Sequence, residues 1–207
     1  MITSADVFFD GDRVHIRSSD PAELKFGILP KPDHSPAGVI SAGHHGVFEL
    51  YASQASPVHV TAKVERLKEA SPRTPVSMGK EVARAPDEAA FDGAASWVIR
   101  IPANESVAVK NVFLRITYEG DIARLYDRGR LISDDFFKGT SWAIGLAPIM
   151  AQEGDPELEL RILPLRKDAP IYLPPGTRPS FPSSGEVAVL KNVQAIPEYE
   201  AVADLKP

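Results

Sequence analysis

The fold is decided by residues 112–119, which read Val112-Phe113-Leu114-Arg115-Ile116-Thr117-Tyr118-Glu119. Apolar side chains stand at every second position, and the positions between them are mostly polar. A period of two places one set on each face of an extended strand. We therefore predict a half-buried strand of an antiparallel sheet, with Leu114 in the core and Arg115 and Thr117 in solvent.

The same alternation recurs at residues 58–65 and 157–162, and it predicts that Val58 and Val60 share a core with Leu158, Leu160 and Ile162. Shorter runs predict further strands at residues 7–9, 14–17, 24–29, 47–52, 97–101, 123–126, 130–132 and 187–193. The dipeptides Asp10-Gly11 and Arg128-Gly129 fall between such runs, where a type I′ hairpin turn needs positive φ. The pattern predicts an all-β chain, an antiparallel β-sandwich or jelly roll.

The chain of 207 residues suits one large β-domain or two small ones. Its 19 Pro and 14 Gly favour turns over long helices. Proline-rich residues 31–46, 69–96 and 170–185 are expected to be irregular, with at most one or two short helical turns at residues 80–85 and 86–91. A single domain over residues 1–207 is our first choice, and two small β units split near residue 105 are the alternative.

Composition excludes several classes of function. A net charge of −5 with scattered basic residues argues against nucleic acid or an anionic membrane as a partner. No run approaches the roughly 18 apolar residues of a membrane span, and the first residues lack the pattern of a signal peptide. We expect a soluble protein or a piece of a larger one, whose compartment the sequence does not indicate. With no Cys there is no disulfide framework or thiolate nucleophile.

No motif predicts a catalytic residue, a metal site or a cofactor. His44-His45 lies between glycines in a predicted polar loop, and a metal would need a third ligand. Asp10-Gly11-Asp12 is explained by its turn and does not match the EF-hand spacing, although a structural calcium stays open. The chain lacks a Gly-x-Ser-x-Gly elbow and a phosphate-binding loop, and among 28 acidic residues no pair stands out as glycosidase carboxylates.

One segment has more potential to bind a ligand than any other. Asp134, Asp135, Phe136, Phe137 and Trp142 fall in a predicted loop between two strands. Carboxylates accept hydrogen bonds from sugar hydroxyls, and aromatic rings stack on the C–H face of a sugar. The alternative is that the rings are core anchors and the acids cap a turn. We predict that at least one of the three rings is exposed, where it would contact a glycan or another domain.

A family resemblance covers about 36 of the 207 residues, from 111 to 146. Three motifs carry it: Gly120-Asp121-Ile122-Ala123-Arg124-Leu125-Tyr126, Asp134-Asp135-Phe136-Phe137-Lys138-Gly139 and Trp142-Ala143-Ile144-Gly145-Leu146. The segment resembles the C-terminal, galactose-binding-like jelly-roll region of bacterial glycoside hydrolase family 35 proteins, which are β-galactosidase-like. The turn departs from that pattern, since Arg128-Gly129 replaces the usual Asn-Gly.

The resemblance implies a non-catalytic accessory domain. In such enzymes the two catalytic glutamates lie on a separate (β/α)₈ barrel, and a barrel of about 250 residues does not fit here. The implied partners are that barrel or a glycan, and the parent enzyme would be periplasmic or secreted. A free-standing carbohydrate-binding module and a small jelly-roll hydrolase or lyase remain alternatives, because fold alone does not define function.

Overall fold

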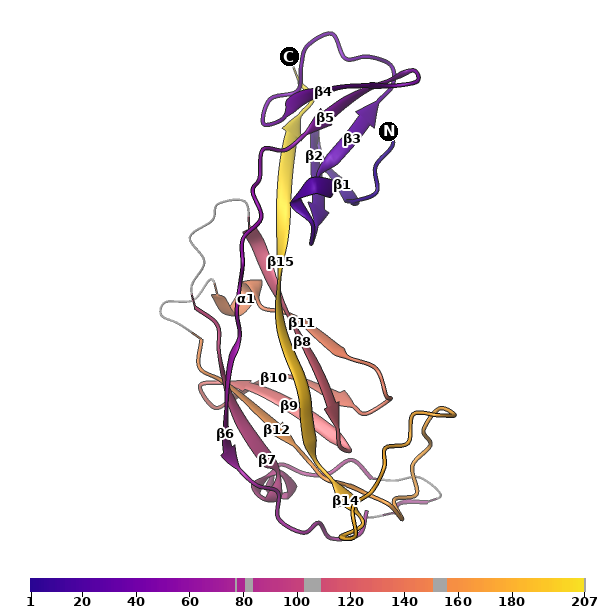
Figure 1. Ribbon diagram of the computed structural model, residues 1–207, viewed down its shortest axis with the longest axis vertical. Helices are drawn as coiled ribbons and strands as arrows, with labels where there is room; N and C mark the ends of the chain where they lie inside the picture. Colours follow the sequence, from indigo (N-terminus) through magenta and orange to yellow (C-terminus); the bar gives the residue numbers. More distant parts are fainter. Residues whose placement is uncertain (77, 81–83, 103–108, 151–155, 207) are drawn as a thin grey trace. The chain divides into compact units, whose positions relative to one another are not determined.

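The computed structural model describes residues 1–76, 78–80, 84–102, 109–150 and 156–206 (Figure 1). The predicted fold class is confirmed, since the chain is nearly all-β and its sheets are antiparallel, in keeping with a β-sandwich. Helix in the described residues is confined to η1 (Pro21–Glu23), η2 (Ala89–Gly93) and α1 (Ala147–Met150). None of these helices is long and apolar enough to cross a membrane.

The strands form four sheets in the described part of the chain. The first has the order β1-β2-β15-β8-β11, from Asp6–Asp10, Arg13–Ser18, Val189–Asp204, Val109–Glu119 and Trp142–Gly145. The second has the order β10-β9-β12-β7-β6, from Arg130–Phe136, Ile122–Asp127, Leu158–Ile162, Ala95–Arg100 and Lys63–Lys68. The two smaller sheets are β3-β5-β4, from Lys25–Ile28, Phe48–Ala52 and Ile40–His45, and β13-β14, from Leu165–Arg166 and Glu186–Val187.

The described residues divide into two compact units. Unit 1 comprises residues 1–60, 109–113 and 196–206, and unit 2 comprises residues 61–76, 78–80, 84–102, 114–150 and 156–195. Two long strands, β8 and β15, contribute one end to each unit. Each unit therefore draws on segments that are distant in the sequence.

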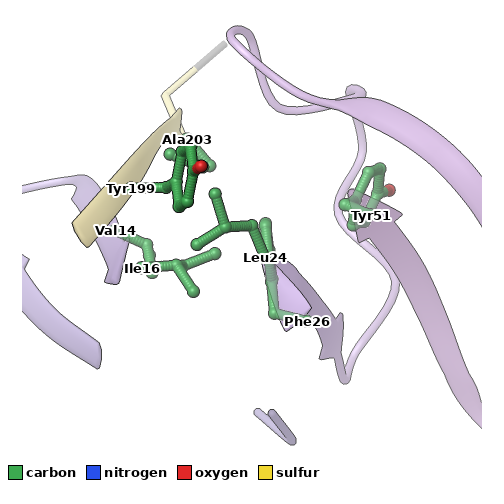
Figure 2. Packing of buried hydrophobic residues seen from close by; sticks show 8 residues of the cluster. Val14, Ile16, Leu24, Phe26, Tyr51, Tyr199 and Ala203 are labelled. Carbon is green, nitrogen blue, oxygen red and sulfur yellow. The ribbon is translucent and has the colours of Figure 1, made fainter. Parts of the chain in front are cut away.

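Unit 1 has its own hydrophobic core (Figure 2). Its buried members come from β2, β3, β5, β15 and the turn after η1, and they are Val14, Ile16, Leu24, Phe26, Tyr51, Tyr199, Ala201 and Ala203. The Tyr199 hydroxyl accepts a hydrogen bond from the Val58 amide at 2.7 Å and reaches the Val58 carbonyl at 3.2 Å. This one side chain thus holds the backbone of the segment that follows β5.

The decisive alternation is confirmed in β8 and β12. Val112, Leu114, Ile116 and Tyr118 are buried, whereas Arg115 is exposed. Leu158, Leu160 and Ile162 are fully buried, and Leu160 lies opposite Leu125 of β9 and Trp97 of β7. The buried faces of β8 and β12 are therefore the ones that the period of two selects.

The strand predicted at residues 58–65 is wrong. Only Lys63–Lys68 forms a strand, β6, which lies at the edge of its sheet with all six residues exposed. Val58 and Val60 are only partly buried, and Val58 packs against the core of unit 1, whereas Leu158 belongs to unit 2. The backbone of Val58 bonds to the Tyr199 hydroxyl, so its polar groups are satisfied without a neighbouring strand.

Both predicted hairpins form, with different turns. Arg128 and Gly129 have φ of 47° and 78°, the two positive values that a type I′ turn requires. In the first hairpin the turn residues are Gly11 and Asp12, and only Gly11 has positive φ, 58°. A single positive φ at the first central residue is typical of type II′, so the type I′ turn predicted there is wrong.

Two strands extend beyond their predicted bounds or were not predicted. Strand β4 crosses the predicted irregular stretch 31–46, where a bulge between Ser41 and His44 coincides with Gly43 at φ 89°. Strand β15 continues to Asp204 although Pro197 interrupts its pattern. Pairing with β2 begins only at Tyr199, so no bond to that strand requires the missing N–H of Pro197.

The remaining Pro-rich segments agree better with the sequence. Residues 170–185 carry no strand or helix, as predicted. A short helical turn forms directly after Pro86-Asp87-Glu88, where η2 begins at Ala89 and the Asp87 carboxylate accepts a hydrogen bond from the Ala90 amide at 3.0 Å. The other predicted helical turn, at residues 80–85, lies partly outside the described residues.

Candidate functional site

The predicted loop at Asp134 is part of a strand. Strand β10 continues to Phe136, so Asp134, Asp135 and Phe136 pair with Arg124, Ala123 and Ile122 of β9. A bulge between Leu131 and Ser133 shifts the phase of the strand at that point, which is why the alternation in the sequence stops at Ile132. The strand period then turns Asp134 and Phe136 outward and Asp135 inward.

Burial separates the five predicted site residues into two groups. Phe136 is 58% exposed and Asp134 is exposed, so the prediction of at least one exposed ring is confirmed. Asp135, Phe137 and Trp142 are buried. The two buried rings are core anchors, and only Asp134 and Phe136 can meet a ligand directly.

Asp135 has a structural role in the strand and the turn that follows. Its carboxylate accepts hydrogen bonds from the Tyr118 hydroxyl at 3.1 Å and the Lys138 ammonium at 2.7 Å. Burial, followed by the nearby Asp135 carboxylate, raises the pKa of Tyr118 far above its ordinary value, so this hydroxyl stays protonated as a donor. The Phe137 ring meets Tyr118 edge-on at 5.7 Å between centroids. These contacts fix the segment that presents Phe136.

A groove of about 490 Å³ lies beside the exposed ring, wholly within unit 2. Residues 134–138 line one side, and Tyr172 and Pro174 line the other. The Tyr172 side chain is 85% exposed. We call this feature the Phe136–Tyr172 groove.

The two sides of the groove are joined by a close contact. Gly139 has φ of 82°, and a side chain there would collide with Thr177. Thr177 in turn donates from its amide and its hydroxyl to the Pro174 carbonyl, at 3.1 Å and 2.8 Å. The loop after β10 and the Pro-rich segment are therefore in direct contact beside the groove.

No motif in the sequence singles out Tyr172 as a site residue. It follows Pro170-Ile171 and precedes Leu173-Pro174, in a segment predicted to run over the surface. An aromatic residue in such a segment has no core to enter, and this signal could have indicated its exposure. What the sequence could not show is that Tyr172 lies on the same groove as Phe136.

The other buried carboxylates of unit 2 also have partners. Asp121 forms an ion pair with Arg73, which also donates to the Pro164 carbonyl at 2.9 Å. Asp127 accepts a hydrogen bond from the Glu157 amide at 3.1 Å. These acids hold the ends of strands and loops, in contrast to the solvent-facing Asp134.

The histidine pair lies in a strand rather than in the predicted polar loop. His44 and His45 belong to β4, are exposed, and stand opposite Glu49 and Phe48 of β5. In the part of the chain that the structure describes, no group of three or more His, Asp or Glu could hold a metal ion. Asp12, at the first hairpin turn, pairs with Lys206.

Comparison with known proteins adds no relative. No family model, curated protein or solved structure matches the chain. The likeness of residues 111–146 to accessory regions of family 35 glycoside hydrolases stays a prediction.

Proposed function

We propose that this chain is a non-catalytic accessory β-sandwich of a β-galactosidase-like, carbohydrate-active enzyme, and that it contacts glycan at the Phe136–Tyr172 groove. One observation carries the proposal: two large aromatic side chains, 58% and 85% exposed, line one groove. Exposed aromatic residues on a common surface usually mark a binding site. Supporting a catalytic domain is the other half of the proposed role.

The chemistry of the groove suits a sugar. The rings of Phe136 and Tyr172 offer apolar faces for the C–H face of a pyranose. The exposed Asp134 carboxylate accepts hydrogen bonds from hydroxyl groups, and the Lys138 ammonium can donate. The volume of about 490 Å³ falls within the range of small-molecule sites.

The family resemblance gives weaker support for a β-galactosidase-like parent enzyme, because contacts within the sandwich already explain two residues of its first motif, Gly120 and Asp121. A side chain at Gly120 would meet Ile162, and the next residue, Asp121, is held by Arg73 and by a 2.9 Å bond from its amide to the Leu163 carbonyl. These two motif residues serve the sandwich itself. The motif therefore supports the class of domain, an accessory β-sandwich, and the groove supports the binding of a glycan.

Titration calorimetry with β-galactosides and plant galactans tests the glycan contact. We expect the isolated chain to bind at least one of them, and Tyr172→Ala or Phe136→Ala to weaken binding about tenfold, the effect of roughly 1.4 kcal/mol from a lost ring contact. Tyr172→Phe keeps the ring and should keep most of the affinity. Phe9→Ala, an exposed ring of unit 1, is the matched control and should change nothing.

Two outcomes would redirect the proposal. Binding that is unchanged in both groove variants would mean that the glycan does not bind at the Phe136–Tyr172 groove. Silence across the glycan panel would favour the purely supporting role, in which Phe136 and Tyr172 contact the catalytic domain. Co-purification of the separately expressed barrel with wild-type chain, and its loss in the two groove variants, would then show that role.

A further inference from the structure

Unit 1 presents a second surface, at the free edge of strand β1. This strand is the terminal member of its sheet, and residues 6–10 pair only with residues 17–13 of β2. In the described residues, no backbone group outside β2 bonds to β1. All five of its residues are exposed, including Val7, Phe8 and Phe9.

The edge of β1 lacks the devices that protect most of the other edges described here. Natural proteins blunt exposed edges with bulges, charged side chains (lysine above all), prolines or very short strands, and of these β1 has only the acids Asp6 and Asp10 at its two ends. Strands β4, β6 and β10 carry bulges, β6 also begins and ends with lysine, and β3 and β11 have four residues each. The run Asp6–Asp10 is regular and carries no bulge, lysine or proline.

Charges alternate from strand to strand on the outer face of this sheet. The acids Glu200 and Asp204 of β15 lie opposite the bases Arg17 and Arg13 of β2, which lie opposite the acids Asp6 and Asp10 of β1. Both arginines bond to β15, with Arg17 2.7 Å from Glu200 and Arg13 3.8 Å from Asp204. Neither Asp6 nor Asp10 has an ion pair in the described part of the chain. A further strand with basic residues at these two levels would complete the ladder.

Apolar side chains fill the three positions between the two acids. Phe8 stacks on His15, with 4.4 Å between ring centroids and 13° between planes. Val7 and Phe9 lie opposite Ile16 and Val14, which are fully buried core residues. Since opposite residues share a face of the sheet, Val7 and Phe9 extend the core of unit 1 to its open flank. Another strand there would bury apolar surface on both faces.

We propose that β1 is a docking edge for an extended segment of a partner polypeptide, with lysine or arginine opposite Asp6 and Asp10 and three apolar residues between them. The segment would add a strand to the sheet through backbone hydrogen bonds. A second copy of this chain fits poorly, because antiparallel pairing of two β1 strands about Phe8 places Asp6 opposite Asp10 twice. Like charges directly opposite each other destabilise a strand pair.

Surface plasmon resonance on the immobilised full chain tests this proposal. The probe is a blocked peptide with lysine at both ends of Val-Phe-Val, flanked by glycines. We expect it to bind on the order of tenfold more tightly than the same peptide with glutamate in place of lysine, because two attractive pairs become repulsive. The double variant Asp6→Lys/Asp10→Lys should reverse the preference, and N-methylation of alternate peptide amides should abolish binding.

The controls separate strand addition from simple charge attraction. Asp33→Lys/Asp92→Lys carries the same change of charge at exposed positions outside β1 and its partner strand β2, and it should keep the preference for the lysine peptide. Circular dichroism confirms that each variant is folded, and the pair of peptides on wild-type chain gives a result even if a variant is not. Equal affinity for both peptides, or undiminished binding of the N-methylated one, overturns the proposal. So does a wild-type dimer in analytical ultracentrifugation that Phe9→Lys disperses, since that would make a second copy the occupant.

Discussion

Leu114 and Leu160 are single residues on which the sandwich of unit 2 depends. Both are fully buried, on β8 and β12. Truncation of either to Ala should lower the free energy of unfolding by roughly 2–5 kcal/mol, because it removes buried methyl groups and leaves a cavity. Arg115→Ala and Thr117→Ala, on the opposite face of β8, should change it by far less. Urea denaturation measures all four, and equal losses would mean that the register of β8 is wrong.

Glu200 links the stability of unit 1 to pH. Burial of this carboxyl opposes its ionisation, but the Arg17 guanidinium, and then His15, outweigh burial and hold the pKa of Glu200 below its ordinary value. A carboxyl with a lowered pKa contributes stability that is present above its unfolded pKa of about 4.3 and is lost as the pH falls through the folded value.

We therefore expect Glu200→Gln to destabilise the protein at pH 7 and to flatten its loss of stability between about pH 5 and pH 3. Urea midpoints at several pH values measure both effects. Glu198→Gln, on the same strand, is the matched control and should leave the acid slope near that of the wild type. If Glu200→Gln leaves the dependence of stability on pH unchanged from that of the wild type, Arg17 does not stabilise the ionised Glu200 carboxylate.

Two glycines with similar φ allow conformational and steric effects to be separated. Gly129 has φ of 78° with open space where a side chain would be, whereas Gly139 has φ of 82° and faces Thr177. Gly129→Ala should cost about 1–2 kcal/mol of stability through its left-handed backbone alone. Gly139→Ala should cost more, because the same strain is joined by a collision. Thermal unfolding of the two variants measures the difference, and equal costs would mean that Thr177 moves aside freely.

Among the elements, the unpaired segment between β5 and β6 depends on a hydroxyl. Tyr199→Phe removes the group that bonds to both the amide and the carbonyl of Val58. We expect a loss of about 1 kcal/mol per unsatisfied group and faster hydrogen exchange at the Val58 amide. Tyr51→Phe, in the same core, is the control, because no hydroxyl bond of Tyr51 is found in the described residues. Val58 exchange that does not respond to Tyr199→Phe would mean that packing alone holds the segment.

Elements that combine alternation with a turn signal were the most predictable. Strands β1, β2, β9 and the start of β10 are flanked by Gly11 or Gly129, and both hairpins form. The predictions were wrong for segments whose strand pairing does not follow from the alternation of apolar and polar side chains. Strand β4 pairs through its backbone around a bulge at Gly43, and the Val58 segment alternates without a partner strand. Neither circumstance can be recognised from local periodicity.

In the candidate site too, some features follow from local sequence pattern and others depend on tertiary contacts. Phe136 was predicted as a site residue, and its exposure follows from the strand phase after the bulge. Phe137 and Trp142, predicted on the same grounds, are buried because their strand and loop positions turn inward. Tyr172 joins the groove through a contact between Gly139 and Thr177, residues 38 positions apart in the chain. A tertiary contact of this kind lies outside what one sequence can predict.

At the scale of the whole molecule, both tryptophans belong to one unit. Trp97 and Trp142 are buried in unit 2, and unit 1 contains no tryptophan. Fluorescence excited at the red edge of the absorption band comes from tryptophan. It therefore reports on unit 2, and unit 1 contributes no signal to it. A comparison of that emission with far-ultraviolet circular dichroism during denaturation would show whether the halves of the chain melt in one step, since coincident curves require a single cooperative transition.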